Sequence, residues 1–294
     1  MIIHETKRWF LNLSVFWVFL DKFKIKGVLG LFMDIKEIRA KLASLGKKEI
    51  AEHSKKYLKS AYAFYGLRVP QLREIARQIK RDNPEMSIYE AYNLFEELWN
   101  SGNHEEMSLA LYLLENHRKQ FSLETWKFLF KEAEGKQRIE KACSWDHIDE
   151  LSSHITGEIF FNNSSLTGEI KKLAESRNPW MRRLAIVSQY PLIKKGKIQL
   201  TILLAEKLVY DPDIYVQKGA GWMLRECGKK NAVQVQEFIK VHRKMKAAAL
   251  SYSTEKMLPF RKHIKDLLEQ DKLDKNNDGD EMKSELEKIK YFKN

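Results

Sequence analysis

The chain has 294 residues, enough for one large domain or an array of helices. Hydrophobic residues make up 44%, with only 13 Gly and 6 Pro, which allows a substantial core and favours helix over sheet. A net charge of +12 attracts polyanions, although a solvated surface also explains it. Two cysteines exclude a disulfide framework and indicate a reducing cytoplasm.

Residues 1–32 contain an apolar run from Trp9 to Leu20. The run is short for a membrane span, and Asn12 and Ser14 interrupt it. No small-residue cleavage site follows. We therefore expect the folded domain to begin near Met33 and residues 1–32 to be an N-terminal extension, with a peripheral membrane anchor and a cleaved signal as alternatives.

From residue 34 to about residue 270 the apolar residues recur at helical spacing. This spacing predicts helices within the segments 34–46, 47–62, 70–82, 87–99, 104–119 and 122–134. A break at 66–70 separates the second segment from the third, and Pro70 suits the first turn of a helix.

Two later helices carry clear start signals. Asn178 is a natural N-cap followed by Pro179, and the sequence DPD (211–213) opens a helix that Gly228 is placed to close. No alternating strand pattern appears. We predict an all-α fold, a HEAT-like helical-repeat superhelix over residues 33–270, with a helical bundle as the alternative. Residues 271–294 form a polar, charged C-terminal tail.

Polar and aromatic residues recur at the interval of a helical repeat. Trp145 and Arg183 are 38 positions apart, and Arg183 and Trp222 are 39 apart, close to one helix–turn–helix unit. Residues spaced by one repeat are expected at equivalent places on successive inner helices. The interval predicts a basic concave surface that carries two indoles, the carboxylate of Asp149 and a guanidinium, which points to nucleic acid.

Several ordered motifs resemble those of the DNA alkylation repair family, the AlkD-like alkylpurine DNA glycosylases. They are YLKSAYAFYGLRVPQLREIA, LWNSGNHEEMSLALYLL, SWDHIDE, NPWMRRLAIV and QKGAGWMLRECGK, and the resemblance covers about residues 34–270. It implies a superhelix of HEAT-like helix pairs whose basic concave face binds duplex DNA. It also implies an enzyme that excises N3- and N7-alkylated purines. One departure lies near the end, where the family often has an arginine-bearing serine motif and this chain reads LSYSTEKMLPFRK.

The resemblance carries functional positions over to this chain: Trp145, Asp149, Arg183, Trp222 and Tyr57. An alkylated purine is cationic and leaves readily, so the remaining task is to stabilise the cationic sugar and deliver water. We assign that task to Asp149. Trp145 and Trp222 would hold the cationic base or sugar by cation–π attraction, and Arg183 would bind a backbone phosphate.

Further cations near these positions are candidates for phosphate contacts: Lys218, Arg225 and Arg182. Simpler interpretations exist for each candidate taken singly, because a tryptophan is usually core, a helical aspartate is often solvated, and a surface arginine often pairs with a carboxylate. Trp180, directly after Pro179, is expected to anchor the helix start.

Other signals are weaker. Residues 274–285 fit an EF-hand loop formally, but a solvated acidic tail explains them. His147, Glu150 and His154 share a helical face, yet HExxH is absent. No nucleotide-binding or acyl-transfer motif occurs. We expect no metal and no cofactor.

The resulting prediction is a cytoplasmic, monomeric DNA repair glycosylase acting on duplex DNA with alkylated bases. It would need no obligate protein partner, and no membrane unless residues 1–32 anchor it. The alternatives are a non-catalytic HEAT-like protein that binds DNA by its structure, and a protein-binding helical scaffold.

Overall fold

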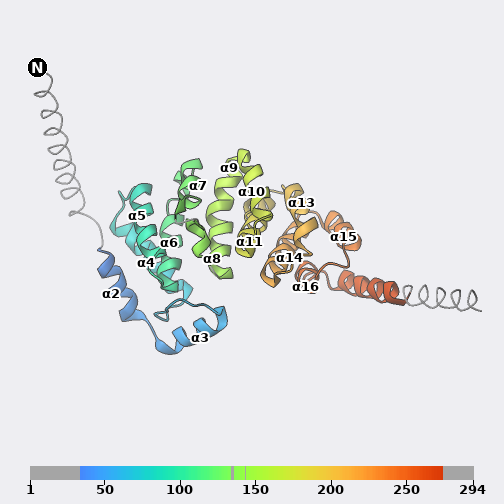
Figure 1. Ribbon diagram of the computed structural model, residues 1–294, viewed down its shortest axis with the longest axis horizontal. Helices are drawn as coiled ribbons and strands as arrows, with labels where there is room; N and C mark the ends of the chain where they lie inside the picture. The colour runs from blue at the N-terminus through green and yellow to red at the C-terminus, as the bar shows by residue number, and fades with distance from the viewer. Residues whose placement is uncertain (1–33, 134–135, 143, 274–294) are drawn as a thin grey trace, which may run out of the picture. The chain divides into compact units, whose positions relative to one another are not determined.

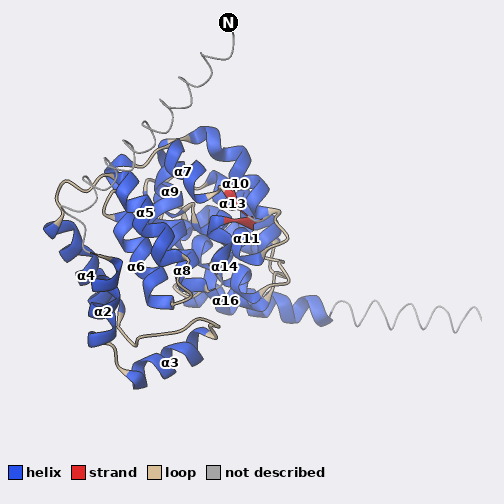
Figure 2. Ribbon diagram, turned by 60° about the vertical axis from the view of Figure 1, so that its left-hand side comes forward, coloured by secondary structure: helices blue, strands red, loops and turns tan. Residues whose placement is uncertain are grey.

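The computed structural model describes residues 34–133, 136–142 and 144–273 (Figure 1). Helices dominate, and the strands of the described part are a single antiparallel pair of two residues each (Figure 2). The prediction of an all-α fold is confirmed. The N-terminal segment 1–32, the EF-hand-like segment 274–285 and Cys143 lie outside the described residues. Among the helices that are described, none has the length and apolar character needed to cross a membrane.

The chain divides into two compact units, one ending at His117 and the other starting at Arg118. The first unit contains five described helices: α2 (Ile35–Leu45), α3 (Lys48–Leu58), α4 (Val69–Asp82), α5 (Ile88–Trp99) and α6 (His104–Glu115). Asp34 caps α2, as its position before the helix predicts, and the break expected at 66–70 is the loop before α4.

A buried carboxylate organises that loop. Glu105 on α6 accepts hydrogen bonds from the backbone amides of Tyr65, Gly66 and Leu67 at 3.0, 2.8 and 3.1 Å. Gly66 has a φ of +93°, and a Cβ there would lie 1.9 Å from the carbonyl oxygen of Lys47, so only glycine fits. The hydrogen bonds to Glu105 therefore help to fix the loop before α4, where Leu67 is also buried.

The second unit contains most of the predicted site. Its elements in chain order are η1 (Arg118–Gln120), α7 (Leu123–Leu129), β1 (Glu132–Ala133), β2 (Lys136–Gln137), η2 (Arg138–Lys141), α8 (Trp145–Glu150), the π-helical η3 (Leu151–Thr156), α9 (Gly157–Asn162), η4 (Ser164–Leu166), α10 (Thr167–Ala174), α11 (Pro179–Val187), α12 (Tyr190–Lys194), α13 (Gln199–Leu208), α14 (Ile214–Gly228), α15 (Ala232–Val241) and α16 (Ala247–Ser253). A last described helix covers residues 258–273 and so passes the point where the polar tail was expected to begin.

The helices of this unit form two layers. Contacts join α8 to α11, α11 to α14 and α14 to α16, and we call these four helices the motif layer (Figure 1). On its other side α10 packs on α11, and α13 and α15 pack on α14. Fully buried residues such as Leu184 and Leu224 fill the space between the layers. Apolar burial of this kind holds successive helices in a stack.

The interval between the recurring residues was interpreted wrongly. Trp145 is the first residue of α8, Arg183 is the fifth residue of α11, which starts at Pro179, and Trp222 is the ninth residue of α14, which starts at Ile214. The position of these residues is therefore shifted by about one turn from each helix to the next, so they do not occupy equivalent places.

Two other rows do occupy equivalent places in the motif layer. The first row, in the first turn of α8, α11 and α14, consists of Trp145, Trp180 and Tyr215. The second row, at the fifth residue of the same helices, consists of Asp149, Arg183 and Lys218. The structural repeat is thus 34–35 residues in this part of the chain.

Three predicted helices, in the segments 47–62, 104–119 and 122–134, end earlier than expected, at Leu58, Glu115 and Leu129. The segment 122–134 is helical only to Leu129, after which the chain forms β1 and β2. Arg138 stabilises this turn, because its amide donates to the carbonyl oxygen of Lys131 at 3.0 Å and its guanidinium lies over the ring of Phe128 and donates to the Phe128 carbonyl. These contacts come from beyond the segment, so helical periodicity within it could not reveal them.

Candidate nucleic-acid interface

The centre of the candidate site is an ion pair between α8 and α11. Arg183 donates from Nε to Oδ1 of Asp149 at 2.9 Å and from Nη2 to Oδ2 at 2.8 Å. Its third nitrogen, Nη1, donates to the backbone carbonyl of Tyr215 on α14. The Arg183 side chain is 7% exposed and the Asp149 side chain 17%. A bidentate pair of this kind fixes both the position and the orientation of the carboxylate.

The local sequence sets where α11 and α14 start. Asn178 caps α11 by accepting from the amide of Trp180 at 3.0 Å, as its place before Pro179 predicts. Asp213 caps α14 in the same way, accepting from Tyr215 and Val216. Both caps define where the helices start, and the fifth residue of each helix then falls in one row.

Burial and the neighbouring charge act on Asp149 in opposite directions. Burial raises the pKa of Asp149 above its ordinary value, the guanidinium of Arg183 lowers it, and Asp146 raises it again by repulsion. The net direction is upward. Arg183 is therefore the group that opposes the effect of burial and favours the ionised form of Asp149.

A π-helical turn follows Asp149 directly. Residues Leu151–Thr156 form it, Ser153 donates from Oγ to the carbonyl of Asp149 at 2.5 Å, and Thr156 Oγ1 lies 2.8 Å from Ser188 Oγ after α11. A Cβ on Gly157 would lie 2.5 Å from the carbonyl oxygen of Ser152. Such turns occur often at functional sites. Sequence reasoning missed this one, although its run of small hydroxyl residues was a signal.

The two predicted tryptophans are partly accessible. Trp145 lies four residues before Asp149 on α8 and is half-buried, so the two share a helix face. Trp222 on α14 is also half-buried, and its ring centroid lies 5.9 Å from that of Tyr190. Trp180, expected to anchor its helix, packs against Tyr215 with centroids 5.2 Å apart.

Like Arg183, two of the three further cations predicted to bind phosphate have carboxylate partners. Arg182 forms a bidentate pair with Asp211 at 2.6 and 2.8 Å and also donates to the carbonyl of Ser176. Arg225 pairs with Glu255. These guanidinium groups tie neighbouring segments together, and the donors of Arg182 are engaged within the protein.

Lys218 differs from them. Within the described part of the chain it has no carboxylate partner, and its ammonium lies 5.7 Å from the ring centroid of Tyr215 and 5.9 Å from that of Tyr252. Both distances are within cation–π range. No carboxylate of the described residues neutralises its charge.

Tyr57 belongs to the first unit. It lies near the end of α3, is 66% exposed and stacks on His53 with centroids 6.4 Å apart. None of the residues of α3 is buried, and five lysines lie on the helix or beside its ends: Lys47, Lys48, Lys55, Lys56 and Lys59. The helix is thus an exposed basic element.

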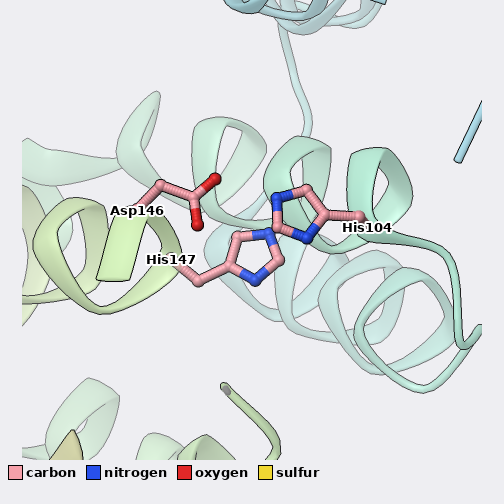
Figure 3. Close-up of side chains that lie close together, drawn as sticks. All are labelled: His104, Asp146 and His147. Atoms are coloured by element: carbon pink, nitrogen blue, oxygen red, sulfur yellow. The ribbon is translucent and has the colours of Figure 1, made fainter. Parts of the chain in front are cut away.

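The histidine face noted in the sequence begins on α8. His147 is buried, whereas Glu150 and His154 are half-buried. Figure 3 shows that the side chains of Asp146 and His147 leave the same helix from adjacent positions.

A cavity of about 710 Å³ lies elsewhere in the second unit. Its lining includes Trp126, Phe130, Glu140, Lys172 and Met181 from α7, η2, α10 and α11. None of the eight predicted site residues lines it.

The fold and the ion pair together describe an all-α protein of stacked helices that holds a carboxylate–guanidinium pair in one layer. The chain belongs to the family of DNA alkylation repair enzymes, whose family model matches residues 38–257. The fold is similar to that of a solved structure described as a predicted DNA alkylation repair enzyme from Enterococcus faecalis. The identity is 20%, the TM-score is 0.61, and the match covers 72% of this chain and 96% of that one. A search of curated proteins finds no match.

Proposed function

We propose that this DNA repair protein is a glycosylase that hydrolyses the N-glycosidic bond of N3- and N7-alkylated purines in duplex DNA. The observation that carries the proposal is the Asp149–Arg183 pair at 2.8–2.9 Å. A largely buried carboxylate that one guanidinium holds in place is suited to stabilise a sugar that becomes cationic as its bond to the base breaks.

The chemistry needs little else from the protein. An alkylated purine already carries positive charge, so its departure requires no general acid of the kind that glycosidases use. Asp149 would stabilise the cationic sugar and orient the attacking water. Trp145, on the same face of α8, and Trp222 would offer indole faces to the base or sugar, each worth about 0.5–2 kcal/mol.

Arg183 has a different role here from the phosphate contact expected from the sequence. Its three nitrogens donate to Asp149 and to the carbonyl of Tyr215, and its side chain is 7% exposed. We assign to it the positioning and ionisation of Asp149. DNA contacts then fall to more accessible groups, Lys218 in the second unit and Tyr57 with the lysines of α3 in the first.

Product analysis tests the proposal. Duplex DNA treated with a methylating agent is incubated with the protein, and the supernatant is analysed for free bases. We expect free N3-methyladenine or N7-methylguanine and an equal number of abasic sites in intact strands. DNA that is bound but never loses a base would favour the non-catalytic DNA-binding alternative. Monomeric state and cytoplasmic location remain predictions.

A further inference from the structure

Tyr252 and Tyr215 flank a lysine that pairs with no carboxylate of the described segments. Of the four cations predicted to bind DNA, Arg182, Arg183 and Arg225 each pair with a carboxylate. Lys218 pairs with none in the described residues and instead lies between two phenol rings. An unneutralised ammonium on a chain of net charge +12 is available to an external anion.

The two rings are themselves accessible. Tyr252 is 37% exposed and Tyr215 is half-buried, and no hydrogen bond engages either hydroxyl in the described part of the chain. Phenol hydroxyls and lysine ammonium groups are both common donors to DNA phosphates. The three side chains therefore present one cation, two free O–H donors and two apolar ring faces on α14 and α16.

A close approach of two backbones creates this arrangement. A Cβ on residue 221 would lie 2.5 Å from the carbonyl oxygen of Ala249 and 2.7 Å from Cβ of Tyr252, so glycine is required there. Gly221 thus lets α16 lie against α14 and brings Tyr252 to Lys218. Tyr252 falls in LSYSTEKM, where the chain departs from the arginine-bearing motif of the family.

We propose that Lys218, Tyr215 and Tyr252 form a contact for the sugar–phosphate backbone of duplex DNA, which extends the interface from α14 to α16. The ammonium and hydroxyl groups bind a phosphate, and the ring faces pack against deoxyribose. The occupant is a DNA backbone because the patch combines a cation and O–H donors and contains no anion that would select a cationic ligand. The inference rests on the proposed DNA substrate but not on catalysis.

The test is the affinity of the full chain for an unmodified duplex, measured by fluorescence anisotropy over a range of salt concentrations. For Lys218→Gln we expect the slope of log affinity against log salt to fall by about 0.9, the value for one lost phosphate contact. Lys171→Gln on α10 removes the same charge far from the patch and should leave the slope unchanged. For Tyr252→Ala we expect affinity to fall about tenfold, the order of one lost charge-assisted hydrogen bond with its packing.

Two further variants separate folding from binding. Tyr252→Phe keeps the ring above Gly221 and removes only the hydroxyl, so it should melt like the wild type and bind more weakly. Tyr210→Ala removes another exposed tyrosine of the same unit and should bind normally. Equal slopes for Lys218→Gln and Lys171→Gln, or wild-type affinity of both Tyr252 variants, would overturn the contact. Base release is measured separately, so failure of the contact leaves the glycosylase proposal intact, and the reverse also holds.

Discussion

Replacement of Arg183 by glutamine tests whether this residue acts through Asp149. The substitution removes two charged hydrogen bonds, at 2.8 and 2.9 Å, from a carboxylate that is 17% exposed, and one donor from the Tyr215 carbonyl. Removal of one partner from a buried pair costs about 3–5 kcal/mol because the other charge stays buried alone. We expect a loss of this order in the free energy of unfolding at neutral pH.

The loss should depend on pH. Burial already raises the pKa of Asp149, and without the guanidinium it rises further. When the pKa of a carboxyl group is higher in the folded than in the unfolded state, the folded protein loses stability as pH rises. The loss begins at the unfolded pKa, about 3.9, and is complete above the folded pKa. The destabilisation of Arg183→Gln should therefore be smallest near pH 4 and grow toward pH 7.

Denaturant unfolding at several pH values measures this, with the double variant Asp149→Asn/Arg183→Gln as the control. The double variant has no buried unpaired charge, so it should be more stable at pH 7 than Arg183→Gln alone. The DNA affinity of Arg183→Gln should keep its salt slope. A pH-independent loss of stability, or a flatter salt slope, would refute the positioning role and favour a direct phosphate contact.

Two structural predictions concern the elements that hold the site. Glu105→Gln removes the charge that three loop amides share and should lower the free energy of unfolding in urea by about 1.5–3 kcal/mol. The control Glu97→Gln, on the exposed surface of α5, should cost almost nothing. Equal effects would show that the loop does not depend on Glu105. Gly221→Ala should lower the free energy of unfolding by about 1–3 kcal/mol because the new Cβ separates α14 from α16. The control Gly168→Ala, where a Cβ meets nothing within 4 Å, should be neutral or stabilising. A neutral Gly221→Ala would contradict the close approach of the two helices.

Local signals predicted the helices and their starts well. Asn178 and Asp213 cap the helices as expected, because capping depends on a few consecutive residues. The repeat register was not predicted, because the interval was counted between chemically interesting residues rather than between helix starts. The register of 34–35 residues follows from the helix starts, which place Trp145 and Tyr215 in the first turn of α8 and α14.

The partners of the charged residues were beyond the reach of the sequence. Arg182 and Arg183 are adjacent and both are candidates for phosphate contacts from the sequence, but one pairs with Asp211 and the other with Asp149, 29 and 34 positions away. Long-range pairs of this kind depend on how helices stack, which no local pattern encodes. Lys218 is predicted together with the arginines. The structure distinguishes it because each arginine pairs with a carboxylate, whereas Lys218 lies beside two tyrosine rings.

The most direct test compares wild type and Asp149→Asn for single-turnover release of free base from duplex DNA carrying one N7-methylguanine. The amide keeps the shape of the side chain and removes the charge that would stabilise the sugar cation. We expect the rate of release to fall by about 10²–10³, the range for loss of one electrostatic contact to a transition state, while affinity for the duplex stays within a few fold. Equal rates of release by the two proteins would show that Asp149 does not carry the reaction.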